Sequence, residues 1–182
     1  MTAGWSTDTG LLVLRLVLFV IMAFHGTQKL FGWWNGGGLD RAAGFFAGQG
    51  FHPPRLMALI AGVTECAGAV LLGAGALTVL GVAMLAGVLT NVTALHWRNG
   101  LDGRRHGCEF ELMLLAGVVA VGFCGPGGWS ADHAFGTPSR VWLGPSAAAL
   151  GLVAGLVINS TRRAPERPPA AEHAARAKES SI

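Results

Sequence analysis

The chain has 182 residues, of which 52% are hydrophobic and only 13% charged, and its formal net charge is +3. Together with a mean hydropathy of +0.50, this composition excludes an ordinary water-soluble domain, because too few charged residues remain to cover its surface. The small net charge also argues against nucleic-acid binding, which needs a basic groove.

Apolar segments predict an all-α fold, a polytopic transmembrane helical bundle. At about 1.5 Å per residue, each segment is close to the ~30 Å hydrocarbon core, the fourth and fifth being a few ångström short. They lack the alternating pattern of a transmembrane β-barrel. The segments are residues 11–34, 56–72, 77–97, 110–124 and 141–158. The chain is therefore expected to have the lipid bilayer as its main partner.

Residues 1–10, before the first segment, are expected to form a short extracytoplasmic N-terminus. This leader carries no Lys or Arg, and no small-residue cleavage site follows the apolar stretch, so we interpret the segment as a retained helix and not as a signal peptide.

The connections between the segments differ in character. Residues 35–55 open with a glycine turn and end in His52-Pro53-Pro54, and their Phe45, Phe46 and Phe51 are expected to enter the membrane interface. Residues 73–76 predict a tight hairpin. Residues 162–182, rich in Ala, Pro, Glu and Arg, are expected to form a disordered cytoplasmic tail.

The distribution of Lys and Arg predicts the topology. With five crossings, eleven of these residues fall on one face and only Arg140 on the other, whereas four crossings would divide them six and six. The positive-inside rule thus favours five spans in a bacterial cell (inner) membrane, with the N-terminus outside and the C-terminus cytoplasmic. Arg15 lies within the first span, where we expect it to snorkel to the interface.

Polar residues inside the spans are the candidate functional groups. From the helical rise, the deepest of them all fall in the cytoplasmic half of the membrane, and intramembrane ionisable groups usually mark functional sites. They are His25, Lys29, Glu65, Asn91 and Glu111. We therefore expect a polar cavity open to the cytoplasm, with Lys29 facing Glu111 and His25 near Glu65.

The candidate catalytic residues are His25, Lys29, Glu65 and Glu111, and Asn91 is a weaker candidate for cofactor binding. Each has a structural interpretation as well. A buried Glu65 can be a protonated carboxyl that joins helices, and Asn91 can bond a neighbouring helix; for Asn91 this structural role is the favoured one.

The sequence contains no signature of a familiar redox cofactor. A flavin or nicotinamide glycine fingerprint, a haem-attachment Cys pair and iron–sulfur spacing are all missing. Cys66, Cys108 and Cys124 are expected at different depths, too far apart for a dithiol. His106, Cys108 and Glu109 lack a recognised ligand spacing, so no metal site is expected.

Four motifs in order suggest a family. They are HGTQK at 25–29, ECAG at 65–68, FEL at 110–112 and GPGGWSAD at 125–132. With them the chain resembles the DoxX family of small bacterial membrane proteins over roughly residues 11–135. The resemblance implies a DoxX-like four-helix core over 11–135 and a link to redox physiology, since relatives include the membrane subunit of thiosulfate:quinone oxidoreductase. The additional transmembrane helix expected at 141–161 lies outside this family core.

The function expected from residues and resemblance together is a membrane subunit linked to quinone- or thiol-dependent redox metabolism. Quinone is the candidate cofactor, with electrons supplied by a partner redox subunit or directly by a small substrate. The alternative is a non-catalytic scaffold or assembly subunit for a partner oxidoreductase. Whether the chain is itself catalytic, and whether it forms a homo-oligomer, stays open at the level of the sequence.

Overall fold

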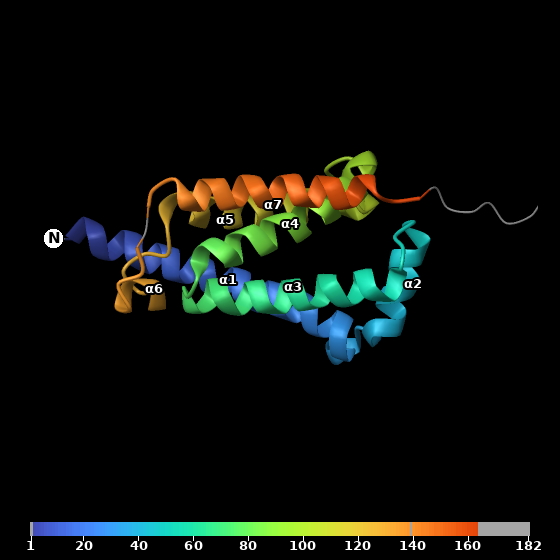
Figure 1. The fold of residues 1–182 in the computed structure, drawn as a ribbon, viewed down its shortest axis with the longest axis horizontal. Coiled ribbons are helices and arrows are strands. Elements are labelled where there is room, and N and C mark those ends of the chain that lie inside the picture. The colour runs from blue at the N-terminus through green and yellow to red at the C-terminus, as the bar shows by residue number, and fades with distance from the viewer. Residues whose placement is uncertain (1, 139, 164–182) are drawn as a thin grey trace, which may run out of the picture.

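The computed structural model describes residues 2–138 and 140–163, which contain helices and no strand. The all-α prediction is confirmed. The α-helices are α1 (Thr2–Phe31), α2 (Gly38–Gly48), α3 (Pro54–Ala74), α4 (Thr78–His96), α5 (Glu109–Cys124), α6 (Ala131–Ala134) and α7 (Leu143–Ser160), and short 3-10 turns follow α1 and α4. Figure 1 shows α1, α3, α4, α5 and α7 running along one long axis, with α6 near one end and α2 at the other.

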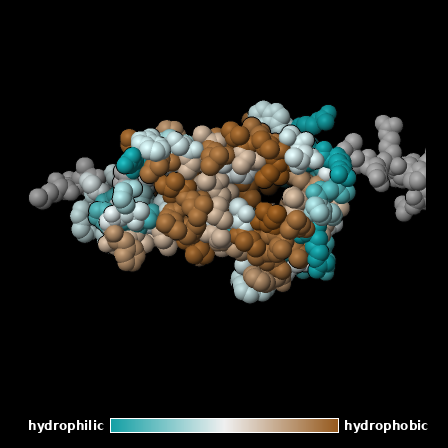
Figure 2. All heavy atoms as spheres, viewed as in Figure 1, coloured by the Kyte–Doolittle hydropathy of each residue, from teal (hydrophilic) through white to brown (hydrophobic). Residues whose placement is uncertain are grey.

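Four helical stretches are long and apolar enough to cross a membrane. They are Gly4–Phe31, Pro54–Ala74, Thr78–Asn99 and Leu143–Ser160. The helix α5, expected as a further span, has 16 residues, or about 24 Å, and packs against α4 and α7 within the bundle. Apolar residues cover the middle of the face shown in Figure 2. The chain is a multi-pass membrane protein.

Tryptophans mark both ends of this apolar band. All six are 50–68% exposed, and they form two groups: Trp5, Trp129 and Trp142 at one end, Trp33, Trp34 and Trp97 at the other. Tryptophan concentrates at membrane–water interfaces, where its ring is in contact with both phases. The two groups therefore indicate the two bilayer surfaces, and we call them the Trp129 end and the Trp97 end.

The helix α7 is part of the bundle's core and not an appendage to it. It packs extensively on α4, because glycines leave room for the backbones to meet: a Cβ on Gly155 would lie only 2.9 Å from the Thr90 Cβ. The side chain of Asn91 donates to the Gly155 carbonyl at 3.3 Å, and that of Asn159 donates to the Asn91 carbonyl at 3.3 Å. Small residues and hydrogen bonds from the Asn side-chain amides thus hold α4 and α7 together, as is usual for helices in membranes.

At the Trp97 end, the connection between α1 and α3 folds back onto the bundle. Phe46 and Phe51 are buried together with Ala58 of α3, so only Phe45, 48% exposed, is available to the interface as predicted. Phe46 and Phe51 are covered because α2 presents an apolar side to α3. The first residues of the expected tail are also held: the Arg163 N–H donates to the Gly50 carbonyl at 2.8 Å. The rest of that tail, 164–182, lies outside the described residues.

At the Trp129 end, Arg15 does not snorkel. Its side chain is fully buried, and its Nη2 donates to the Trp129 carbonyl. The expectation was wrong because the loop after α5 covers the guanidinium, so that a backbone carbonyl takes the place of interfacial water. Its Nε and Nη1 have no hydrogen-bond partner among the described residues.

The same loop is fastened to the start of α4 by Asp132. Its carboxylate accepts from the Leu77 N–H at 2.9 Å, the Thr78 N–H at 2.9 Å and the Thr78 hydroxyl at 2.7 Å, while its own N–H donates to the Gly75 carbonyl at 2.8 Å. It thus satisfies N–H groups that a helix start leaves free. Burial alone would raise the pKa of Asp132, but these hydrogen bonds to the carboxylate outweigh it, and the pKa lies below its ordinary value.

We predict that Asp132→Asn lowers the stability of the protein in a pH-dependent way. At neutral pH the variant should lose about 1–3 kcal/mol, since bonds to a charged group are replaced by weaker ones. A carboxyl whose folded pKa is depressed stabilises fully above its unfolded pKa of about 4 and loses that contribution as the pH falls through the folded pKa. Thermal unfolding of both proteins in one detergent should show the gap closing in acid; a gap independent of pH would contradict this account.

Candidate functional site

The candidate site forms where α1 and α3 approach closely near the Trp97 end. A Cβ on Gly26 would lie 3.0 Å from the backbone nitrogen of Cys66 and 3.0 Å from the Gly62 carbonyl oxygen, and a Cβ on Gly62 would lie 2.8 Å from the Leu30 side chain. Only residues without side chains allow backbones to come this close. The contact brings the last turns of α1 alongside the middle of α3.

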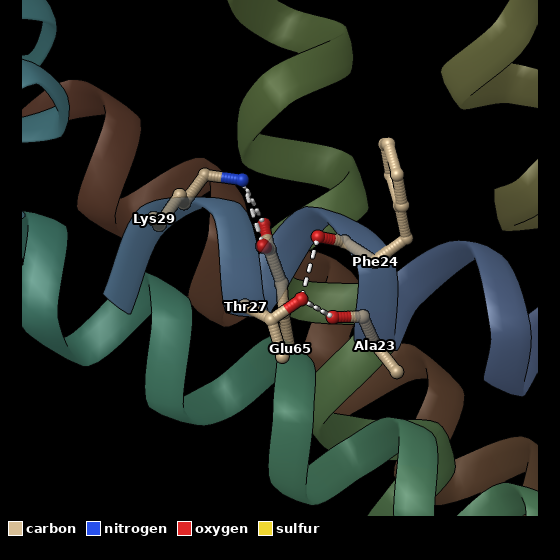
Figure 3. Close-up of polar contacts among 5 residues, drawn as sticks. All are labelled: Ala23, Phe24, Thr27, Lys29 and Glu65. Carbon is tan, nitrogen blue, oxygen red and sulfur yellow. Dashed lines mark hydrogen bonds and ion pairs between the residues drawn. The ribbon is translucent and has the colours of Figure 1, made fainter. Parts of the chain in front are cut away.

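This approach joins Lys29 of α1 to Glu65 of α3 in a buried ion pair. The Lys29 Nζ donates to Glu65 Oε2 at 2.7 Å and to Oε1 at 2.9 Å, and only 3% of the glutamate side chain is exposed, against 26% for the lysine. Figure 3 shows the Glu65 side chain extending from α3 past α1 to meet the Lys29 ammonium, beside Thr27, whose hydroxyl donates to carbonyls of its own helix. Lys29 is thus the more accessible member of the ion pair.

The pairing differs from the expected one, in which Lys29 faced Glu111. The reason is the direction in which helical side chains lean, toward the N-terminus of their own helix. The helices α1 and α3 run in opposite directions, so Lys29 leans toward the bilayer centre and Glu65 leans toward the Trp97 end. Their side chains meet although their Cα atoms lie at different depths.

Glu111 at the start of α5 pairs with His96 at the end of α4. The His96 Nδ1 lies 3.0 Å from Glu111 Oε1, and the imidazole is 28% and the carboxylate 15% exposed. The other carboxylate oxygen, Oε2, is buried without a hydrogen-bond partner in the described part of the chain. His96 was not among the predicted site residues. The signal that could have found it is its place at the end of one apolar segment, at the same bilayer surface where the segment of Glu111 begins.

His25 lies between these two pairs. Its ring contacts that of Phe110 edge to face, with 6.0 Å between centroids, and it interacts electrostatically with Lys29 and with Glu111. With Lys29 it lines an open cavity of about 200 Å³ to which α2 contributes Arg41 and Phe46. No hydrogen bond joins His25 to Glu65 in the described part of the chain.

Arg41 is another site residue that sequence reasoning missed, because it lies in a segment expected to be only a connection between two spans. It reaches the cavity because the chain reverses at Gly37, whose φ of +79° is the left-handed conformation that suits glycine. The segment 36–38, three glycines before a short amphipathic stretch, is the signal that could have predicted a helix folded back onto α1.

Asn91 is not brought to this site, since its side chain bonds the α7 backbone. The three cysteines are free: Cys66 is partly buried, Cys108 buried and Cys124 exposed. In the described part of the chain, no group of three or more His, Cys, Asp or Glu side chains is placed to hold a metal ion. The arrangement therefore offers a lysine, two histidines and two carboxylates as groups that bind polar atoms and exchange protons.

We predict that removing one member of the buried pair costs more than removing both. Lys29→Met should destabilise the protein by about 3–5 kcal/mol, because Glu65 is left without its partner, whereas Lys29→Met combined with Glu65→Gln should recover most of that loss. A double-mutant cycle of thermal unfolding in one detergent measures this coupling. Additive losses would mean that the two side chains do not depend on each other.

Comparison with known proteins gives one family. No match was found among curated proteins or among solved structures. The family model DoxX matches residues 10–97, which run from the first turns of α1 to the end of α4 and include Lys29 and Glu65. The match is shorter than the expected 11–135 and ends before α5. Residues 10–97 thus carry a DoxX domain, and this match supports membership of the DoxX family.

Proposed function

We propose that this protein is a membrane subunit that binds the headgroup of a quinone and exchanges protons with it, while a partner redox subunit supplies or takes the electrons. The observation that carries the proposal is the buried Lys29–Glu65 pair beside His25, at the edge of a small cavity. An ion pair inside a membrane is expensive to maintain and is usually kept for function.

The chemistry of the cavity suits a quinone. Reduction of a quinone to its quinol consumes two electrons and two protons, and its two oxygens accept hydrogen bonds. Lys29 and His25 are donors on the cavity wall, and histidine exchanges protons near neutral pH. A volume of about 200 Å³ is below the usual range of ligand pockets, so it suits the ring alone, with the apolar tail left in the lipid.

A proton path from this cavity is supported by the second pair. His25 interacts electrostatically with Glu111, Glu111 bonds His96, and His96 lies next to Trp97 at the bilayer surface. A proton released by a bound quinol can pass along these three side chains to water, since each can hold it in turn. The electrons follow a separate route through the partner.

The orientation follows from charge. We infer that the Trp97 end faces the cytoplasm, because Lys29, Arg41, Arg55, Arg98, Arg104, Arg105, Arg162 and Arg163 lie there, while exposed Arg140 lies at the Trp129 end. The quinone headgroup would then bind near the cytoplasmic surface of a bacterial cell membrane.

We predict that cysteines placed at the two ends react differently. In a chain whose native cysteines are changed to Ala, His133→Cys should react with a membrane-impermeant maleimide in intact spheroplasts, and Arg105→Cys only after lysis. Both positions are exposed. The reverse pattern would invert the inferred orientation.

We predict that Glu65→Gln abolishes quinone binding and turnover. Without the carboxylate, Lys29 loses the partner that orients it, and the site loses a proton acceptor. The test measures quinone retained by the purified protein and quinol turnover by membranes at matched expression. Glu109→Gln is the control, because this exposed carboxylate also lies at the Trp97 end but only accepts from the Gly103 N–H. Equal binding by both variants, or none by the intact protein, would contradict quinone chemistry.

The alternative is a non-catalytic scaffold, and one observation favours it. Both oxygens of Glu65 are already bonded to Lys29, as in a pair that serves only to join helices. A scaffold predicts that Glu65→Gln leaves a partner's activity intact as long as the protein folds, whereas deletion of the chain abolishes it. Quinol turnover in membranes with the intact chain, with Glu65→Gln and without the chain therefore distinguishes a scaffold from a quinone site.

A further inference from the structure

A second and larger cavity lies at the opposite end of the bundle from the candidate site. Its volume is about 500 Å³, and it lies between the start of α4, the end of α5, the loop around α6 and the start of α7. This volume falls within the range of sites that bind small molecules. The cavity touches neither Lys29 nor Glu65, so the proposed function does not account for it.

The cavity is apolar in depth, and exposed apolar side chains flank its opening. Val82 and Val121 on its wall are fully buried, whereas Phe123 and Val141, also on its wall, are 64% and 85% exposed. Large exposed apolar residues at the Trp129 end of the bundle face the membrane interface. An apolar chain can therefore pass from the bilayer into the cavity without crossing water.

The rim of the cavity is basic. Arg140 and His133 line it and are exposed, and Arg140 makes no ion pair with any other residue that the structure describes. Asp132 also lines the cavity, but its carboxylate is occupied by Leu77 and Thr78 at the start of α4. The charge available to a ligand at this rim is therefore positive.

We propose that this cavity binds one acyl chain of an anionic phospholipid, with the headgroup phosphate beside Arg140 and His133. The apolar wall takes the chain, the basic rim takes the phosphate, and the open side between Phe123 and Val141 lets the second chain stay in the bilayer. A water-soluble anion would use the rim but not the wall, and a neutral lipid the wall but not the rim.

The test uses the full-length protein in vesicles of phosphatidylcholine that contain spin-labelled lipid. Electron paramagnetic resonance measures the immobilised fraction of labelled phosphatidylglycerol and, separately, of labelled phosphatidylcholine with the same chains. The intact protein should prefer phosphatidylglycerol about fivefold, the effect expected of one basic residue beside an anionic headgroup. Inorganic phosphate should not displace the lipid.

Two pairs of variants separate the cavity from the general surface. Arg140→Gln should abolish the preference, whereas Arg98→Gln, an exposed cation at the other end, should keep it. Val79 lies on the cavity wall and is 41% exposed, so Val79→Phe should fill the cavity and reduce immobilisation of both lipids. Val70 lies on α3 outside the cavity and is 56% exposed, so Val70→Phe should not reduce it. Thermal unfolding confirms that each variant is folded.

Four results would overturn the proposal. Equal immobilisation of the two lipids by the intact protein would remove the headgroup site. If Arg140→Gln and Arg98→Gln lowered the preference for phosphatidylglycerol equally, the preference would come from general surface charge. Displacement by inorganic phosphate, or full binding by Val79→Phe, would show that the acyl chain is not held in the cavity.

Discussion

The structure depends on one constraint: a polar group inside hydrocarbon has to find its partner within the protein, because lipid offers none. In this chain several of those partners come from neighbouring elements, so the polar residue also fixes how the two elements pack together. Lys29 joins α1 to α3, Glu111 joins α5 to α4, and Asn91 joins α4 to α7. Arg15 and Asp132 do the same for the loop that covers the Trp129 end.

Close packing of backbones makes these bonds possible. Gly26 and Gly62 let α1 and α3 touch, and the ion pair forms where they do; Gly155 lets α7 approach α4, and the amide of Asn91 bonds at that contact. In lipid the hydrophobic effect gives helices little reason to associate, so contact area and interhelical bonds must supply the attraction. Glycines and polar residues therefore act together in this fold, and neither would be enough alone.

Much of this arrangement can be predicted from the sequence, because length and hydropathy indicate which long segments are helical. The confirmed all-α fold and the multi-pass membrane character follow from that. Side-chain partners are harder, since they depend on the lean and rotation of each helix. Lys29 was assigned to Glu111 from Cα depths alone, and Arg15 was expected at the interface because nothing in its own segment shows that a loop more than a hundred residues later covers it. The helix α2 was missed because its apolar side is short and lies between glycines.

The residues that follow α7 are bound to the connection between α2 and α3, because the Arg163 N–H donates to the Gly50 carbonyl. The guanidinium of the preceding residue, Arg162, also lies over the Phe51 ring, 5.9 Å from its centroid, so the end of α7 is latched twice to the connection between α2 and α3. Phe51 packs on Phe46 of α2, and Phe46 lines the cavity of His25 and Lys29. The end of α7 is therefore joined to the wall of that cavity by an unbroken run of contacts, from Arg162 through Phe51 to Phe46.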